Sequence, residues 1–590
     1  MLDPRIYRAA LLPVLLALLV VAFSLEGRPA PLRSTPAVET FDGARAMRQL
    51  AVLSTSFPER RPGGSQDTAL AGVVARELRQ ALPGVVVRSD RFTGRTIDGE
   101  RDLVTVSAAV PGSSPGAQLV VVAARDATGH GAAARLSGTA ALLELARTIG
   151  TMRPARGVTF ASISGGTGGQ AGMRDLVRRL EGPVDAVVEL GDLAGPDSGL
   201  PPVVGWSDSR GTAPLRLART AQLALRVETG REPATASSAA QLARLAWPFA
   251  VGPQGVANAA GLPTVRLSAS GEPPPPRDAP LSAARLEARG RAALRTLLAL
   301  QAGPRIAPAT ESRLTVARRT LPEWAVRVLS LALLLPALLT VIDGVARLRR
   351  RGEPLLRWLG WVASLGAPFL LAGLFARGIG AFGALPATAP PALPVDAPLR
   401  GADWAALGVV LVVLALGFLL VRPLLARWAR ATEPGGAPGA TLAPALVAVL
   451  GGLVAWLVNP YAALLLALPA SLWLVLADGG PRPPRPVALA LVTASLAPPA
   501  MLIASLADQL AVPIADVPWL ALLGLAGGQG GPWELVGWSA MAGAACAALV
   551  VALRRPEAGR DGVRRVTVRG PLSYAGPGSL GGTDSAMGRR

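Results

Sequence analysis

The residues able to do chemistry in this sequence are few. A glycine-rich turn, GGTGG at residues 165–169, follows an apolar, β-branched run and precedes a segment with helical spacing. The 590 residues include one histidine, His130, and one cysteine, Cys546. These counts exclude an intramolecular disulfide, a thiolate metal cluster and a site built on two imidazoles. Any chemistry at the turn therefore depends mainly on carboxylates, hydroxyls and backbone amides.

One interpretation of the turn is a dinucleotide-binding loop. The segment from Gly166 to Ala171 fits G-x-G-x-x-A, and Glu189 ends the next predicted strand about 20 residues on, where a ribose-binding acid would lie. Two strand–helix units precede the turn, however, whereas such a fingerprint opens its fold. No Gly-Lys-Ser/Thr follows, which makes a phosphate-binding P-loop weaker still. A plain tight turn between strand and helix is the second interpretation.

Nucleophilic catalysis has little support in the sequence. A triad of Ser137, His130 and Asp126 is conceivable, but no G-x-S-x-G elbow is present. We expect Ser137 instead to cap a helix that begins at Gly138. Cys546 lies in a predicted membrane span, which excludes cysteine hydrolysis in the large domain.

The elements that must position these residues are of two kinds. Hydrophobic residues make up 51% of the chain and the mean hydropathy is +0.41, which indicates a mixture of membrane and soluble parts. Between residues 28 and 320, apolar runs alternate with amphipathic helical patterns, which predicts an extracytoplasmic α/β domain with a mostly parallel sheet flanked by helices. The expected strands are 103–110, 118–126, 157–164, 184–190 and 262–268, and the expected helices are 66–82, 138–150, 172–181 and 282–301.

The rest of the chain predicts an α-helical polytopic membrane protein. Residues 1–27 read as an uncleaved transmembrane anchor, residues 321–555 as a membrane domain of about seven spans, and residues 556–590 as a disordered cytoplasmic tail. The expected spans are 324–346, 357–380, 403–425, 441–458, 460–477, 486–507 and 533–553.

Arginine predicts the orientation in a plasma membrane. Arginine-rich segments follow the first, third, fifth and last of the seven spans, which puts both termini in the cytoplasm and the large domain outside. The apolar segment 517–531 is short and broken by glycine, and if it crossed, the tail would end outside; we expect it to be re-entrant or interfacial. The net charge is +20, and all 59 basic side chains are arginine. Together with 66 Gly and 54 Pro, this composition indicates a base bias of a bacterial genome, so the charge does not predict a nucleic-acid partner.

The order of motifs resembles a known family. Residues 119–149, 153–173, 186–195 and 259–267 are similar to the di-zinc aminopeptidases, that is, the aminopeptidase Y and glutaminyl-cyclase-like exopeptidases. In that family a strand ends in H-x-D, D-x-x-S-G opens a helix, G-E-E-x-G-x-x-G ends a later strand, and a last histidine precedes A-G-[IL]-P. The resemblance covers roughly residues 45–300 and implies a zinc-exopeptidase-like fold.

The residues that bind zinc in the family are replaced here. Ala124 stands at the first histidine and Ala134 at the bridging aspartate, while Gly166 and Thr167 replace the pair of glutamates. The last histidine maps loosely to Gln254. Alanine and glycine side chains cannot bind a cation, so the resemblance implies a degenerate site with no cofactor and no catalytic residue.

Some polar residues of the pattern remain and define a possible residual pocket. Asp126 matches the aspartate of the family's H-x-D, which supports the first histidine without binding zinc itself, and Asp192 matches its aspartate ligand. Glu189, Ser137 and His130 lie in nearby segments, and His130 is most simply an exposed loop residue. Backbone amides of the glycine turn could still hold a peptide carboxylate or another anion.

One anchor, an exopeptidase-like domain and several spans together resemble two eukaryotic proteins. These are the endoplasmic-reticulum metallopeptidase of the family and the Gaa subunit of GPI transamidase, and the missing ligands make this chain more similar to the second. GPI anchors are not expected in a bacterium, so only the architecture and the non-catalytic logic are carried over.

Three functional hypotheses follow from these observations. The first is a catalytically degenerate membrane protein that binds a peptide, protein tail or envelope component outside the cell and docks protein partners through its spans. The second is an active metallo-aminopeptidase that holds zinc with Asp126, Asp192, His130 and Glu189 as unusual ligands. The third is a transporter or envelope assembly factor that acts through the spans.

Overall fold

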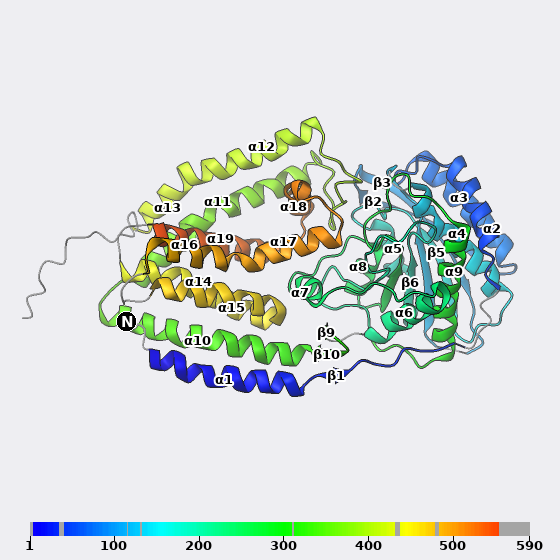
Figure 1. Cartoon of the computed structure of the whole chain (residues 1–590). Helices are drawn as coiled ribbons and strands as arrows, with labels where there is room; N and C mark the ends of the chain where they lie inside the picture. The colour runs from blue at the N-terminus through cyan, green and yellow to red at the C-terminus, as the bar shows by residue number, and fades with distance from the viewer. Residues whose placement is uncertain are drawn as a thin grey trace, which may run out of the picture. The chain divides into compact units, whose positions relative to one another are not determined.

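The structure, a computed structural model, describes residues 4–34, 40–114, 116–129, 132–308, 312–430, 437–477 and 483–553. His130 and the predicted tail 556–590 lie outside these ranges. The described residues confirm the expected fold class, because a mixed α/β sheet with flanking helices is followed by a helical region (Figure 1).

The α/β part is built on a seven-stranded sheet with the strand order β2-β3-β5-β4-β6-β8-β7. Strands β5, β4, β6 and β8 run parallel, while β2 and β3 form an antiparallel hairpin at one edge and β7 pairs antiparallel with β8 at the other. The strands are β2 (Val87–Thr96), β3 (Gly99–Val110), β4 (Gln118–Ala124), β5 (Val158–Ile163), β6 (Val184–Leu190), β7 (Val203–Val204) and β8 (Thr264–Leu267).

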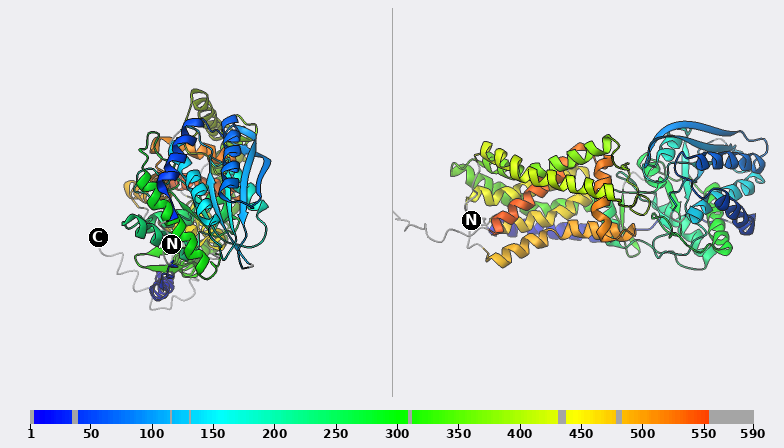
Figure 2. Two further views of the ribbon diagram at one scale, coloured as in Figure 1. Left: turned by 90° about the vertical axis from the view of Figure 1, so that its right-hand side faces the viewer. Right: turned by 90° about the horizontal axis from the view of Figure 1, so that it is seen from above.

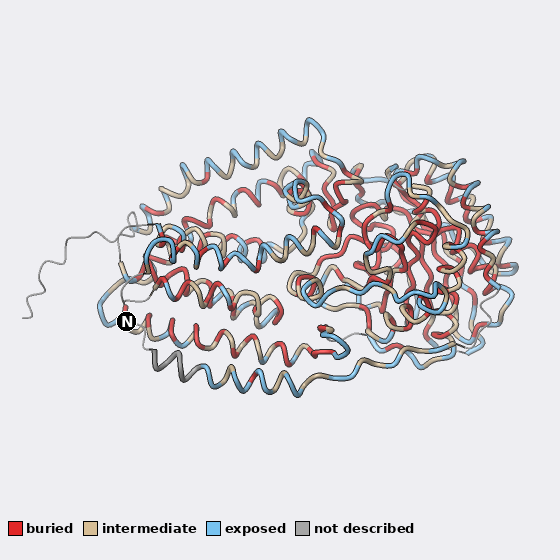
Figure 3. The backbone as a smooth tube through the Cα atoms, in the orientation of Figure 1, coloured by how far each residue is buried: buried red, intermediate tan, exposed pale blue. Residues whose placement is uncertain are grey.

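Helices cover both faces of this sheet because its central strands are apolar on both sides. In β4, Leu119, Val121 and Ala123 face one hydrophobic core, and Val120 and Val122 face another. The first core is closed by α2 (Gly43–Ser56), α3 (Ser65–Ala81), α4 (Ala132–Gly150), α6 (Leu215–Thr229) and α9 (Ala283–Ala302), and the second by α5 (Ala171–Arg179) and α8 (Pro253–Ala259). Figure 3 shows the central strands as almost continuously buried.

Three features of this part differ from the sequence-based expectations. Strand β2 was not predicted, because its sequence, VRSDRFTGRT, is largely polar and only partly buried at the sheet edge. Residues 313–322, where the expected α/β and membrane domains meet, were not predicted as strands, yet β9 (Arg313–Val316) pairs with β10 (Arg319–Pro322), and β10 also pairs with β1 (Glu26–Gly27). Helix α4 begins at Ala132 rather than at Gly138, so the prediction that Ser137 caps it is wrong.

Gly138 explains why α4 packs so closely on the sheet. A Cβ atom at this position would lie 2.3 Å from the carbonyl oxygen of Leu190 and 2.6 Å from that of Gly191. No residue with a side chain fits there without moving backbone, so glycine allows the helix to approach the end of β6. This contact sets the position of α4 beside the carboxyl ends of the strands.

The helical part contains seven helices, among the described residues, that are long and apolar enough to cross a membrane. They match the expected spans and comprise α10 (Glu323–Arg350), α11 (Leu355–Ala381), α12 with α13 (Gly401–Trp428), α14 (Pro438–Val458), α15 (Pro460–Ala477), α16 with α17 (Arg485–Gln509) and α19 (Pro532–Leu553). Helices α10, α14 and α15 pack side by side (Figures 1 and 2).

Two shorter apolar helices accompany these seven. The expected anchor forms α1 (Pro4–Phe23), whose described apolar stretch is Leu11–Phe23. The segment expected to be re-entrant or interfacial contains α18 (Val517–Gly527), whose 11 residues rise only about 16 Å, roughly half the hydrocarbon thickness of a bilayer. Trp519 of α18 is buried and donates a hydrogen bond to the carbonyl of Ala397, 2.8 Å away, in the loop between α11 and α12.

Candidate functional site

The candidate site lies at the carboxyl ends of the parallel strands β4, β5, β6 and β8. A small cavity of about 60 Å³ opens there, which is room for a few water molecules. The sequence-predicted residues Ala124, Asp126, Gly166, Glu189 and Asp192 line it. Parallel strands bring such residues together because their carboxyl ends meet at one edge of the sheet.

The glycine turn is held by Asp126. The two carboxylate oxygens of this residue each accept a hydrogen bond of 2.9 Å, one from the backbone N–H of Gly166 and one from that of Thr167. Asp126 is only 3% exposed, and burial, followed by the negative charge of Asp67, raises its pKa above the ordinary value for aspartate. Both oxygens therefore fasten the turn, and the amides of Gly166 and Thr167 that could bind an anion are already occupied.

The turn lies against the end of β4. A Cβ atom at Gly166 would lie 2.8 Å from the Cβ of Ala124 and 3.2 Å from Oδ1 of Asp126. The backbone has therefore closed over the space where longer side chains at these two positions would need to be. Ala134 is buried in the first turns of α4 and is not among the described residues that line the cavity.

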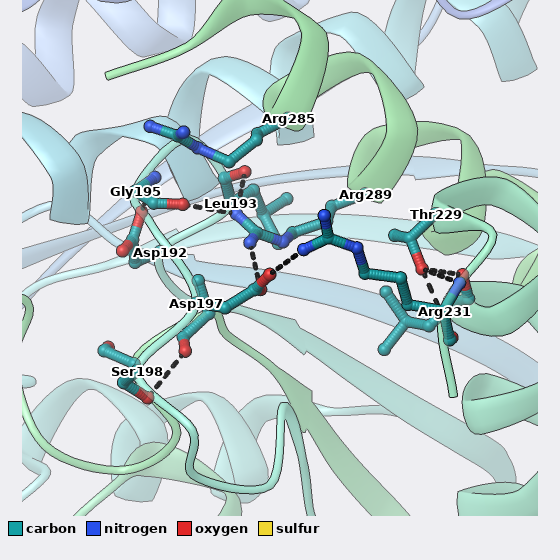
Figure 4. Close-up of polar contacts among 12 residues, drawn as sticks. Asp192, Leu193, Gly195, Asp197, Ser198, Thr229, Arg231, Arg285 and Arg289 are labelled. Atoms are coloured by element: carbon teal, nitrogen blue, oxygen red, sulfur yellow. Dashed lines mark hydrogen bonds and ion pairs between the residues drawn. The ribbon is translucent and has the colours of Figure 1, made fainter. Parts of the chain in front are cut away.

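Asp192 is also used by the backbone around it. Its Oδ1 accepts hydrogen bonds from the N–H groups of Ala194 at 3.1 Å and Gly195 at 2.8 Å, while its buried Oδ2 has no hydrogen-bond partner among the described residues. Burial raises the pKa of Asp192. Figure 4 shows how Arg289 from α9 supports this turn by donating to the carbonyls of Leu193 and Gly195.

Ser137 joins α4 to the same turn. Its hydroxyl accepts a hydrogen bond from the N–H of Leu193 at 2.8 Å and donates to the carbonyl of Ala134 at 2.5 Å. The Oγ atom is 3.4 Å from Oδ1 of Asp192. Ser137 therefore bridges α4 and the end of β6 by backbone hydrogen bonds rather than presenting a free nucleophile.

The remaining acids at the site are paired with arginine. Both carboxylate oxygens of Glu189 accept from Nη1 of Arg266, at 2.9 and 3.0 Å, and burial raises the pKa of Glu189 against the opposing effect of Arg266. Glu272 accepts from Arg244 and from Nε2 of Gln254, each at 2.6 Å. Gln254, the position matched to a zinc histidine, is thus directed at Glu272 and is not among the described residues that line the cavity.

A loop from the helical part completes the cavity. This α11–α12 loop, residues 382–400, contributes Pro391, Ala392, Leu393 and Asp396 to the lining. Nη2 of Arg135 lies 2.6 and 2.7 Å from the two carboxylate oxygens of Asp396.

The α11–α12 loop also contacts the glycine turn directly. The N–H of Gly169 donates to the carbonyl of Pro390 at 2.8 Å, and Arg174 of α5 donates to the carbonyl of Ala389. Gly168 and Gly169 adopt positive φ angles of 74° and 68°, a conformation that glycine adopts easily. The α11–α12 loop therefore packs against the glycine turn and covers it.

The donors at this site do not fit a pair of zinc ions. Two zincs need several carboxylates and imidazoles that converge on one point. In the ranges that the structure describes, no three His, Cys, Asp or Glu residues are grouped so that they could hold a metal ion. The carboxylate of Asp126 accepts hydrogen bonds from backbone amides, and that of Glu189 is paired with Arg266. His130 lies outside the described residues.

Sequence reasoning missed the arginines of the site and the residue from the α11–α12 loop. Arg135 follows the degenerate position Ala134 directly, and Asp396 is an isolated acid in a proline-rich segment between two spans. These two residues are 261 positions apart, so no local pattern predicts that they meet. The available signal was a single acid in a proline-rich loop between two apolar spans.

No family model matches the chain, and no curated protein sequence matches it. Among solved structures, the α/β part is similar to an Acidobacteriales bacterium glutaminyl cyclase, with 16% identity, 46% of this chain and 99% of that chain covered, and a TM-score of 0.35. A Zn-dependent exopeptidase from Bacteroides vulgatus has 16% identity, coverage of 46% and 98%, and a TM-score of 0.32. The LapA aminopeptidase of Legionella pneumophila has 12% identity, coverage of 46% and 76%, and a TM-score of 0.36.

These similarities are at the level of the zinc-exopeptidase-like fold that the sequence predicts. At such identities and TM-scores they carry no argument about substrate or mechanism. The resemblance to the Gaa subunit of GPI transamidase and to the endoplasmic-reticulum metallopeptidase stays a sequence-based prediction.

Proposed function

We propose that this protein is a non-catalytic, membrane-embedded member of the exopeptidase-like proteins, whose α/β part binds a peptide, a protein tail or an envelope component as an accessory subunit. The observation that carries the proposal is the contact between Gly166 and Ala124. At two positions where the family has zinc ligands or a general base, the backbone has closed so far that no side chain fits between them.

The polar residues that remain support a binding role. Asp126 and Asp192 hold backbone turns, and Glu189 and Glu272 neutralise arginines. A general base must have a free lone pair directed at a water or substrate proton, and Asp126, Glu189 and Glu272 have both oxygens bonded. Among these acids only Asp192 keeps an oxygen, Oδ2, without a hydrogen-bond partner, and in the described residues it belongs to no group of three acids, histidines or cysteines that could hold a metal ion. A binding pocket needs only shape and a few fixed polar groups, which the site retains.

Metal analysis and enzyme assays test the proposal on the purified full-length protein. We expect no tightly bound zinc and no chelator-sensitive release of an amino-terminal residue from aminoacyl p-nitroanilides. About two zincs per chain, the number that the di-metal mechanism requires, together with chelator-sensitive activity, would overturn it in favour of the metallo-aminopeptidase.

The third hypothesis, that the protein acts through its spans, is tested by complementation of a deletion strain with pocket variants. In the source organism, a chain with altered pocket residues should fail to complement a deletion if the α/β part is the working part. A pocket variant that accumulates normally and complements fully would favour a transporter or assembly factor.

We also propose that the chain lies in the plasma membrane with the α/β part outside and both termini in the cytoplasm. Contacts of the α/β part with alternate helix junctions support this orientation. The N–H of Gly169 bonds to Pro390 between α11 and α12, Asn459 between α14 and α15 donates to the carbonyl of Leu245, and Arg244 donates to Gln509 at the end of α17. The arginine-rich segments follow the opposite ends of the spans.

A further inference from the structure

Asp396 occupies the pocket much as a ligand would. Its side chain is 7% exposed, although it belongs to a loop between two candidate membrane helices. Besides the contacts with Arg135, it accepts a hydrogen bond of 2.6 Å from the hydroxyl of Thr128, which follows β4. The α/β part thus supplies a cation and a hydroxyl, and the carboxylate comes from another segment of the chain.

Among the residues that the structure describes, Asp396 is the acid that forms an ion pair with Arg135. The side chain of Arg135 is 16% exposed, and its Nη1 also donates a hydrogen bond of 3.3 Å to the hydroxyl of Thr167. A largely buried guanidinium is costly without an anion, and arginine binds carboxylates with strong, directional hydrogen bonds. A carboxylate at the position of Asp396 therefore stabilises the buried guanidinium of Arg135.

Asp396 also separates two cavities. It lines the small cavity described above and a second, open cavity of about 510 Å³. The larger cavity lies between the β2–β3 turn and the ends of α11 and α12, and Arg95, Asp98 and Arg400 are among its lining residues. A volume of this size accommodates a small organic ligand or the end of a peptide. Among the described residues, Asp396 is the one that lines both cavities, and Arg135 lines the smaller one.

We propose that Arg135, Thr128 and Thr167 form a carboxylate-binding site for the bound peptide or envelope component, and that Asp396 is a tethered carboxylate which fills the site until a ligand displaces it. This inference rests on the proposed function, because it assumes a pocket without metal. The ligand enters from the larger cavity, and the α11–α12 loop moves as its carboxylate replaces that of Asp396. Binding in the pocket is thereby transmitted to α11 and α12.

The carboxylate of Asp396 competes with any added carboxylate for Arg135, and this competition can be measured. A ligand of the intact protein must displace Asp396, so its apparent affinity is its intrinsic affinity multiplied by the fraction of molecules in which the site is empty. The variant Asp396→Ala leaves Arg135 unpaired and opens the site. Acetate, the smallest carboxylate probe, should then bind and stabilise the variant more than it stabilises the intact protein.

The experiment measures melting temperatures of the full-length protein in detergent at pH 7.5, with sodium acetate against sodium chloride of equal ionic strength. Asp396→Ala should melt lower than the intact chain, and saturating acetate should raise its melting temperature by about 1–3 °C over chloride. The double variant Arg135→Gln with Asp396→Ala should show no acetate effect. Asp278→Ala, which removes an exposed carboxylate that lines neither cavity, is the matched control and should also show none.

Peptide probes distinguish the source of the carboxylate. N-acetyl-Ala-Ala carries a terminal carboxylate, N-acetyl-Asp-Ala-amide carries one on a side chain, and N-acetyl-Ala-Ala-amide carries neither. Stabilisation of Asp396→Ala by one or both of the first two, but not by the third, supports the site. Equal behaviour in acetate and chloride, with no effect of either acidic peptide, overturns it. If Asp396→Ala does not fold, Asp396→Asn is measured in the same way.

A chelator arm separates this inference from the proposed function. Each titration is repeated after treatment with a chelator and with the zinc content measured. Stabilisation by acetate that disappears with the chelator would mean that a metal binds the carboxylate, and would overturn both proposals. Absence of any carboxylate effect in a zinc-free protein would overturn the carboxylate site alone.

Discussion

Gly166 and Ala124 face each other so closely that a Cβ atom added to Gly166 would lie 2.8 Å from the Cβ of Ala124. Contacts below about 3 Å between carbon atoms are strongly repulsive, since carbon atoms are in optimal contact at about 3.5–4.0 Å. The two residues therefore belong to one packed surface, and neither position can regain a ligand-sized side chain without movement of the turn.

We expect the substitution Gly166→Ala to destabilise the protein for this reason. Overpacking by one methyl group costs typically about 1–3 kcal/mol, which should appear as a lower melting temperature. Gly72, exposed in the middle of α3 with nothing within 4 Å of its added Cβ, is the matched control. Gly72→Ala should be neutral or stabilising by up to about 1 kcal/mol. Equal melting temperatures for the two variants would contradict the packed turn.

The buried ion pair beneath the site should matter far more than an exposed one. Arg125 and Asp67 are each 1% exposed, and their closest charged atoms are 2.9 Å apart. Removing one partner leaves an uncompensated buried charge, so Asp67→Asn should cost about 3–5 kcal/mol of unfolding free energy. Measured by denaturant titration, this value should exceed that of the control described next.

The control is Asp98→Asn, which breaks the pair of Asp98 with Arg61. Their side chains are 22% and 46% exposed, and pairs of this kind contribute about 0–1 kcal/mol. A loss at Asp98 as large as that at Asp67 would mean that burial does not decide the strength of these pairs.

Asp208 predicts a dependence of stability on pH. Burial raises its pKa from 3.8 to about 7, an effect that Arg174 opposes and the nearby Glu272 reinforces. Between these two pH values the folded state keeps a proton that the unfolded state releases, so the contribution of Asp208 to stability is largest below pH 3.8 and is lost as the pH rises towards 7. The shift corresponds to roughly 4 kcal/mol in total.

The variant Asp208→Asn removes this titration. Its melting temperature, measured from pH 4.5 to 8, should fall less steeply than that of the intact protein, and the difference should level off above pH 7. Asp278→Asn, at an exposed carboxyl, is the control and should keep the steeper profile. Parallel profiles for the intact protein and Asp208→Asn would show that Asp208 does not titrate in this range.

The sequence predicts most of the scaffold and much less of the site. Strands β4, β5 and β6 and helix α9 are apolar or periodic runs bounded by turn residues, so local patterns identify them. The edge strand β2 is polar and owes its conformation to pairing with β3, which a local pattern does not report.

Pocket chemistry was harder to predict because it depends on long-range contacts. Asp126 and Asp192 do lie at the pocket, as their places after strands indicate, yet both bind backbone amides. The contact of Arg135 with Asp396 joins two parts of the chain that have different hydropathy and no common motif. The role of Ser137 also depends on a long-range contact, because its hydroxyl bonds to Leu193 just after β6, and its position before Gly138 does not predict that bond.

The proposed orientation predicts that positions 351 and 382, at the two ends of α11, lie on opposite sides of the membrane. Phe382, 93% exposed, follows the end of α11 that leads to the α11–α12 loop, and Arg351 follows α10 at the other end. In a background with Cys546→Ala, Phe382→Cys should react with a membrane-impermeant maleimide on intact cells, whereas Arg351→Cys should react only after permeabilisation. The reverse pattern would put the α/β part in the cytoplasm, and the positive-inside argument would then fail.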